Sequence, residues 1–156
     1  MTIEQATAAH LEGVNRLLYQ VADVHRHGRP DLFRADAKKY NDSELCAIFK
    51  NESTPVFVAL DDDDTVLGYA FCIIEEIENH PLLMDDKSLY IDDLCVEENH
   101  RGQHIGKALL EFVRQYAKSI RCRRITLNVW ECNPSAMAFY RKNGFLPLKT
   151  GMEELL

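Results

Sequence analysis

A glycine-containing turn joins a strand pattern to a helix pattern, and this junction constrains the fold more than any other segment. The apolar run Ser88–Val96 is typical of a strand, and the amphipathic run Ile105–Lys118 is typical of a helix. The turn at residues 101–107 (RGQHIGK) contains two glycines and two fixed positive charges. Free N–H groups and the helix dipole at such a helix start attract anions. The segment therefore predicts a site for a phosphate or pyrophosphate group.

One alternative interpretation of this turn remains, and two known phosphate-binding motifs do not match it. A tight surface turn with flanking charges has the same residue types and remains an alternative. The Gly-x-Gly-x-x-Gly spacing of dinucleotide-binding folds is absent. No Gly-Lys-Ser/Thr follows, which excludes a P-loop.

Length and composition predict one domain covering residues 1–156, placed in the cytoplasm. No apolar run approaches the roughly 20 residues that cross a bilayer, so no membrane partner is expected. The N-terminus lacks the basic and apolar regions of a signal peptide. Five cysteines without a Cys-x-x-Cys pair fit free thiols in a reducing compartment better than disulfides or a metal site.

Charge is unevenly distributed along the chain. Residues 99–124 hold seven Lys/Arg and one acid, a local +6, so a net charge of −7 leaves −13 for the remainder. The basic block coincides with the predicted phosphate turn, as a polyanionic cofactor requires, although part of it is also explained as a solvated helix face. The acidic remainder disfavours nucleic acid and suits a cationic substrate.

The order of apolar patterns predicts an α/β fold of the α+β type, built on one mixed sheet. Asn133 and Pro134 are typical of a helix start, and Gly144 of a helix end. Asp61–Asp64 reads as a hairpin tip rather than a cation site. A helix is predicted from the Thr7 cap to about Val24, followed by a loop over His25–Arg34 and a second helix over Ser43–Lys50. The predicted strands are Ile3–Ala6, Val56–Leu60, Val66–Ile77, Leu89–Val96, Ile125–Trp130, Phe145–Leu148 and Gly151–Leu155.

With these segments in order, the chain resembles the GNAT superfamily of acetyl-CoA-dependent N-acetyltransferases over essentially its whole length. The superfamily's phosphate loop, Arg/Gln-x-x-Gly-x-Gly/Ala, is matched by residues 101–106 (RGQHIG). The preceding Leu-x-Val is matched by residues 94–96 (LCV). The later Asn-x-x-Ala-x-x-Phe-Tyr-x-x-x-Gly-Phe pattern is matched by residues 133–145 (NPSAMAFYRKNGF). One departure is His104, which stands where the loop usually has a glycine. A side chain fits there if the residue keeps a negative φ and its Cβ points away from the pyrophosphate. The imidazole of His104 then either offers an N–H to the phosphates or faces solvent.

The resemblance implies a central, mostly antiparallel, splayed sheet flanked by helices, with acetyl-CoA as co-substrate and no metal. The strand that holds residues 94–96 would carry a bulge and diverge from its neighbour, so that the pantetheine arm enters the gap. A backbone N–H near Val96 would polarise the thioester carbonyl. The residues implied to bind the cofactor are Leu94, Cys95, Val96, Arg101, Gly102, Gln103, His104, Ile105, Gly106, Lys107 and Asn133.

The resemblance also implies direct transfer to the amine, with two proton tasks. Tyr140 matches the tyrosine that protonates the departing thiolate, although a tyrosine after a phenylalanine on a helix also suits simple packing. Asp92 or Asp93, directly or through water, would take the proton from the incoming ammonium. Asp92 is preferred because it matches an acidic position in polyamine-acetylating relatives. A solvated carboxylate pair is the alternative.

The acceptor is less defined. In this fold the first helix–loop–helix roofs the acceptor pocket, which makes His25, Arg29, Asp31 and Phe33 the substrate-binding candidates. The basic loop suits an amine that also bears a carboxylate, whereas the acidic strands favour cations. Small-molecule amines such as amino acids, polyamines and aminoglycosides, and the N-termini or lysines of peptides, all remain open.

The expected function is N-acetyl transfer from acetyl-CoA to a primary amine. A non-catalytic acyl-CoA-binding or regulatory module of the same fold is the alternative. Such a binder needs only the phosphate loop, so the presence of both Tyr140 and the Asp92–Asp93 pair favours the enzyme. The apolar residues in Leu146–Leu156 are expected either to pair across a homodimer or to cover the protein's own core.

Overall fold

A single five-stranded mixed sheet organises the computed structural model, which describes all 156 residues. The strands lie in chain order across the sheet; the first four are antiparallel neighbours, and the fourth and fifth are parallel. This arrangement confirms the expected mostly antiparallel α+β sheet. The strands are β1 (Thr2–Gln5), β2 (Val56–Leu60), β3 (Val66–Ile77), β4 (Asp86–Val96) and β5 (Arg124–Leu127).

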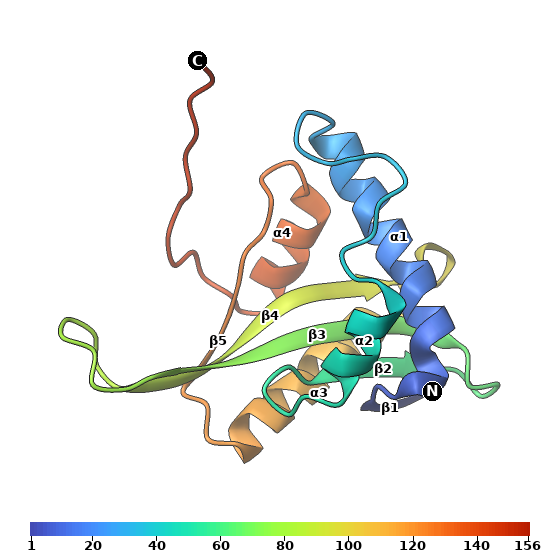
Figure 1. Ribbon diagram of the computed structural model, residues 1–156, viewed down its shortest axis with the longest axis horizontal. Helices are drawn as coiled ribbons and strands as arrows, with labels where there is room; N and C mark the ends of the chain where they lie inside the picture. The colour runs from blue at the N-terminus through green and yellow to red at the C-terminus, as the bar shows by residue number, and fades with distance from the viewer.

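Helices cover both faces of the sheet. Two lie over one face and a third over the opposite face, while the last stands beyond the end of β5 (Figure 1). Each layer buries its own apolar cluster against the sheet. None of the helices is both long and apolar enough to cross a bilayer. The helices are α1 (Leu11–Gly28), α2 (Asp42–Phe49), α3 (Ile105–Ser119) and α4 (Pro134–Lys142).

The first helix is longer than its sequence pattern indicated. Thr7 caps a short 3-10 turn, and α1 then continues to Gly28, so the predicted loop over His25–Arg34 begins only at Arg29. The amide of Arg29 donates to the carbonyl of His25 at 2.8 Å, which completes the last turn. Basic residues in that turn suit the negative end of the helix dipole. As a result His25 lies on a helix rather than in a loop.

The acidic tract between β2 and β3 is a hairpin tip, as predicted. The side chain of Asp61 accepts hydrogen bonds from the amides of Asp63 and Thr65 at 2.9 and 2.8 Å. The following strand, β3, occupies the predicted residues and pairs with β4 over a long two-stranded arm that extends beyond the body of the sheet (Figure 1).

Both predicted C-terminal strands are absent. Residues 143–156 form neither helix nor strand, and the chain runs away from the sheet after α4 (Figure 1). The period-two apolar pattern at Leu146 and Leu148 suits a strand, but no strand of the same chain pairs with it. β5 also ends early, at Leu127 rather than Trp130, because its partner β4 diverges beyond Ile91.

Candidate active site

The turn before α3 has the geometry of an anion site. The amides of residues 103–107 donate to no acceptor within the protein, and the first backbone hydrogen bond of the helix runs from Ala108 to the carbonyl of His104. Arg101 and Lys107 are exposed on either side of these free N–H groups. Convergent amides at the positive end of a helix dipole bind phosphate oxygens.

Two residues of this turn adopt left-handed backbone conformations. Gly102 has φ 81°, and His104, the N-cap residue of α3, has φ 64°. His104 therefore does not meet the condition of a negative φ under which a side chain fits the turn without strain. The glycine of the superfamily pattern stands here because the turn needs a positive φ, which costs an L-residue roughly 1–2 kcal/mol. Histidine is among the side chains that adopt this conformation more often than most.

A close approach brings the start of α3 against the end of β4. A Cβ on Gly106 would lie 3.4 Å from Val96 Cγ2 and 3.6 Å from the ring of Phe139. Ile105 is buried beneath it. The phosphate turn, the last residues of β4 and α4 therefore meet at Gly106, where a Cβ would make ordinary van der Waals contacts.

A bulge in β4 lies at Asp92. Ile91 pairs with Cys72 and Asp93 with Phe71, so Asp92 is the extra residue on β4. The bulge resets the alternation of side chains. Ile91 and Leu94, three residues apart, both pack in the cluster on the α3 side of the sheet.

Both carboxylates consequently reach the opposite face, toward α1. The carboxylate of Asp93 accepts a hydrogen bond from Tyr69, and that of Asp92 contacts Lys39 and Tyr40 from the segment before α2. The bulge that the resemblance implied is therefore present, and it is the feature that brings the two acids to one face.

Beyond the bulge, β4 has an open edge. Its pairing with β5 stops at Ile91 and Leu127. The amide of Glu97 donates to the carbonyl of Leu67 on β3 at 2.8 Å. Because residues whose amides face the partner strand alternate in an antiparallel ladder, the amides of Leu94 and Val96 point away from β3, toward the gap between β4 and β5. Cys95 faces the other way into the core, where burial raises the pKa of its thiol to about 12.

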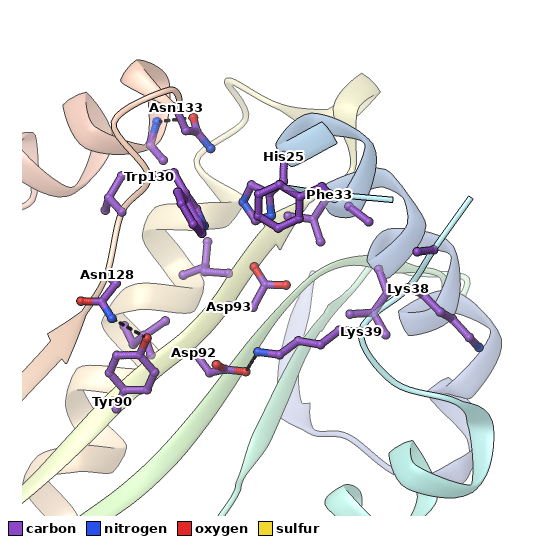
Figure 2. Close-up of a pocket in the computed structure, with 18 of the residues that line it drawn as sticks. His25, Phe33, Lys38, Lys39, Tyr90, Asp92, Asp93, Asn128, Trp130 and Asn133 are labelled. Atoms are coloured by element: carbon purple, nitrogen blue, oxygen red, sulfur yellow. Dashed lines mark hydrogen bonds and ion pairs between the residues drawn. The ribbon is translucent and has the colours of Figure 1, made fainter. Parts of the chain in front are cut away.

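A cavity of about 550 Å³ connects this gap with the two carboxylates. Figure 2 shows that Asp93 lies below the rings of His25 and Trp130, while Asp92 turns toward Lys39. Helix α1, the segment before α2, the bulged part of β4, the chain after β5 and α4 all contribute to the wall. The lining residues are Leu18, Val21, Ala22, His25, Phe33, Arg34, Ala37, Lys38, Lys39, Tyr90, Ile91, Asp92, Asp93, Leu94, Asn128, Val129, Trp130, Asn133, Ala136 and Tyr140.

The two carboxylates have different surroundings. Asp92 accepts hydrogen bonds from Lys39 Nζ at 2.5 Å and the Tyr40 hydroxyl at 3.2 Å. Asp93 accepts one from the Tyr69 hydroxyl at 2.7 Å. Burial raises the pKa of the Asp93 carboxyl from 3.8 to about 6, against the opposing effects of the Tyr69 hydrogen bond and the Lys39 charge. Asp93 can therefore exchange a proton near neutral pH.

Tyr140 lines the same cavity from α4, and it is half-buried. Burial, with the nearby Asp93 charge, raises the pKa of its hydroxyl, so the group keeps its proton at neutral pH. Its ring also packs edge-on against Phe139 and Phe145, so the packing role considered from sequence is real as well. Asn133 caps α4 as predicted, accepting from the amide of Ala136 at 3.1 Å.

The predicted substrate residues divide into two groups. His25 and Phe33 line the cavity and pack with Trp130, with ring centroids 5.1 Å apart for His25–Phe33 and 5.3 Å for Phe33–Trp130. Arg29 and Asp31 are outside the lining. Their side chains pair with each other at 2.7 Å, and Arg29 also pairs with Glu153 at 2.5 Å.

Several lining residues were not singled out from the sequence. Lys39 and Trp130 reach the cavity from segments without a recognisable motif, and Tyr69 reaches Asp93 from the core of β3. A half-buried carboxylate needs hydrogen-bond donors, and this general requirement is the one signal from which such partners could be expected. No group of three or more His, Cys, Asp or Glu side chains lies close enough together to hold a metal ion.

Several known proteins are similar to this chain in sequence or in fold. A point mutant of the BH1408 protein from Bacillus halodurans has a crystal structure that matches with a TM-score of 0.96, 33% identity, and 100% and 99% coverage of the two chains. The peptidyl-lysine N-acetyltransferase YjaB of Salmonella typhimurium is 31% identical over 72% of this chain and 64% of its own length. An aminoglycoside N-acetyltransferase, AAC(6')-Iy, in complex with CoA shares the fold at 17% identity, with a TM-score of 0.72 and 99% and 98% coverage.

The sequence pattern of one family accounts for most of the chain. It matches residues 18–145, which include the cavity-lining part of α1, the bulged strand, the phosphate turn and α4. The chain belongs to the acetyltransferase (GNAT) family, whose members transfer an acetyl group from acetyl-CoA to an amine.

Proposed function

We propose that this protein transfers the acetyl group of acetyl-CoA directly to a primary amine of a small molecule, or to the N-terminus or a lysine of a peptide. One observation carries the proposal. The cavity that opens onto the free edge of β4 also holds a carboxyl whose pKa is about 6 and a tyrosine that keeps its proton. An acid and a base beside one thioester site are what direct acyl transfer requires.

The residues near the gap fit acetyl-CoA, which supplies an activated acetyl thioester when bound. The free amides of residues 103–107 hold the pyrophosphate, with Arg101 and Lys107 adding positive charge. The outward amides of Leu94 and Val96 bind the pantetheine arm as an added strand would, and the Val96 N–H stabilises the oxyanion. Asn133 contributes its side-chain amide at the start of α4.

We assign the base role to Asp93 in preference to Asp92, the residue favoured from sequence. Efficient general bases have a pKa near the working pH, and the pKa of Asp93 is about 6. Asp92 is committed to its ion pair with Lys39. Its negative charge also raises the pKa of Asp93, so Asp92 acts as a positioning residue.

Tyr140 acts as the general acid. A neutral hydroxyl in a desolvated site gives its proton to the departing CoA thiolate, and the same burial that raises its pKa keeps it protonated until then. No cysteine is needed as a nucleophile. All five are free thiols, and Cys72 and Cys95 are buried with pKa values raised to about 12.

The charges around the cavity favour an amine that also carries an acidic group. Arg34, Lys38 and Lys39 face two carboxylates, a formal balance of +1 in a chain whose net charge is −7. Lys38 and Lys39 are paired with Asp42 and Asp92, whereas Arg34 pairs with no carboxylate. Arg34 is thus available for an anionic group of the acceptor.

A thiol-release assay tests the enzyme directly. Acetyl-CoA is offered with primary amines, including amino acids and their C-terminal amides as matched pairs, and CoA binding is titrated in parallel by calorimetry. We expect thiol release with the amino acids to exceed that with the amides, and Arg34→Gln to remove the difference. Binding of CoA without release on any acceptor would refute catalysis, and equal rates within each pair would refute only the acidic-group preference.

We also propose a cytoplasmic location, because five free thiols are stable in a reducing compartment. Fractionation of cells that produce the full chain tests this. Recovery of the protein outside the cytoplasmic fraction would contradict it.

A further inference from the structure

Three aromatic rings form one part of the cavity wall. His25 comes from the last turn of α1, Phe33 from the loop that follows it, and Trp130 from the chain after β5. The ring centroids of His25 and Phe33 lie 5.1 Å apart, and those of Phe33 and Trp130 lie 5.3 Å apart with the rings edge to face at 81°. We call these three side chains the aromatic corner. Neither of the two proton transfers assigned above uses any of them.

The backbone around the aromatic corner holds its two sides close together. The carbonyl of Trp130 accepts a hydrogen bond from the amide of Asn133 at 2.9 Å, which fixes the turn between β5 and α4. The last turn of α1 approaches this turn so closely that a Cβ on Gly28 would lie 2.6 Å from Cys132 Sγ. Any side chain at position 28 would therefore push the two sides apart. The corner is thus formed before an acceptor arrives.

The aromatic corner lies where the body of an acceptor has to lie. Figure 2 shows the carboxylate of Asp93 below the rings of His25 and Trp130. An amine whose nitrogen reaches this carboxylate consequently places the group attached to that nitrogen against the rings. Trp130 is 43% exposed, so part of its ring surface is left uncovered by the protein. The corner therefore offers ring surface to the part of the acceptor next to the amine.

The charges of the site favour contact between this surface and an uncharged group. Burial, together with the charge of Lys39, lowers the pKa of the His25 imidazole, so this ring is neutral at neutral pH. The cations of the cavity lining outnumber its acids by one, which opposes a second positive charge on the acceptor. Neutral aromatic rings set edge to face pack favourably with one further ring, in an offset-stacked or edge-to-face arrangement.

We propose that His25, Phe33 and Trp130 select acceptors in which the primary amine is joined by a short alkyl chain to an aromatic ring, aromatic amino acids among them. This assignment rests on the proposed acetyl transfer, because it places the nitrogen at Asp93. The alkyl chain spans from the carboxylate to the rings above it, and the aromatic ring of the acceptor packs into the corner. An acceptor with a flexible aliphatic body gains no such contact.

Trp130 is the only tryptophan of the chain, so its fluorescence reports binding at the corner without any turnover. Phenethylamine and cyclohexylethylamine are titrated separately in the presence of CoA. They share the ammonium group and the number of carbon atoms, and the saturated ring is at least as hydrophobic, so burial of apolar surface alone does not favour the aromatic ring. We expect a saturable change in fluorescence and a Kd about 2- to 10-fold lower for phenethylamine.

Two leucine variants test the assignment to these side chains. Phe33→Leu keeps an apolar side chain and the Trp130 reporter but removes one ring of the corner, and it should bind the two amines with equal affinity. Tyr19→Leu is the matched control. Tyr19 lies on α1, is 48% exposed and is outside the cavity lining, so its variant should keep the wild-type preference for phenethylamine.

Equal affinities of the wild type for the two amines would overturn the proposal. So would fluorescence that does not change with phenethylamine, or a preference that persists undiminished in Phe33→Leu. Thiol release with the same two amines judges the acetyl transfer separately. A preference in binding without thiol release would support the aromatic corner and count against catalysis, whereas thiol release without a preference would overturn only the aromatic corner.

Discussion

The Tyr69→Phe variant tests which carboxylate is the base. The Tyr69 hydroxyl donates to Asp93 at 2.7 Å, and this hydrogen bond stabilises the charged form of the carboxyl. Phenylalanine keeps the ring in its fully buried place, edge-on to Phe71 with centroids 5.0 Å apart, and removes only the donor. The carboxylate of Asp93 then loses stabilisation, and its pKa must rise.

The size of the rise follows from the strength of the bond. A hydrogen bond to a charged group contributes about 1.5–3 kcal/mol, and one pKa unit corresponds to about 1.4 kcal/mol. The pKa of Asp93, about 6 in the wild type, should therefore increase by about 1–2 units in Tyr69→Phe. A base must be deprotonated to act, so the acidic limb of the rate profile moves to higher pH by the same amount.

The assay is kcat/KM for the amine as a function of pH at saturating acetyl-CoA. Tyr40→Phe is the matched control, since it removes a tyrosine hydroxyl that contacts Asp92 at 3.2 Å instead. We expect a shifted midpoint for Tyr69→Phe and an unchanged one for Tyr40→Phe. An unshifted or lowered midpoint in Tyr69→Phe refutes the reasoning, and a shift in Tyr40→Phe alone would assign the base to Asp92.

Three further variants test separate parts of the structure. Tyr140→Phe should lower kcat about 10²–10⁴-fold and leave CoA affinity unchanged by calorimetry, because only a proton donor is lost; a matching loss of affinity would indicate a binding role instead. His104→Gly should raise the free energy of unfolding in urea by up to about 1 kcal/mol, because the φ of 64° no longer strains an L-residue, and a destabilised variant would contradict this. Asp93→Asn should be more stable than wild type at pH 7 and not at pH 4. A carboxyl whose pKa is raised from 3.8 to about 6 contributes stability below pH 4 that is lost as pH rises through 6, about 3 kcal/mol in all; equal stability differences in urea at both pH values would refute it.

Local signals predicted most of the elements well. Strand β3 covers the predicted residues 66–77, and Asn133 caps α4 with Pro134 at its first position. These features depend on periodicity and on residues with strong backbone preferences, which act within a few positions along the chain. The end of α1 was missed because its last turn, with two histidines and a glycine, lacks an apolar stripe.

Contacts between distant segments were not predictable in this way. Lys39 lies 53 residues before Asp92, and Tyr69 lies 24 residues before Asp93, yet these pairs decide how each carboxylate behaves. Their pairing depends on the register of β3 with β4 and on the path of the segment before α2. The predicted strands Phe145–Leu148 and Gly151–Leu155 are absent for a related reason, since a segment with a strand pattern forms a strand only where a partner strand is present.

The bulge at Asp92 is a local feature of β4 that decides contacts between distant segments. Adjacent residues in a regular strand point to opposite faces, so sequence alone places one of the two acids in the site and the other in the core against α3. One extra residue in β4 turns both toward the cavity and at the same time ends the pairing with β5. Each acid then has a different hydrogen-bond partner: Asp92 accepts from the Lys39 cation, whereas Asp93 accepts from the neutral Tyr69 hydroxyl in a desolvated position. A single local irregularity thus opens the edge for the cofactor and separates the pKa of the base from that of its neighbour.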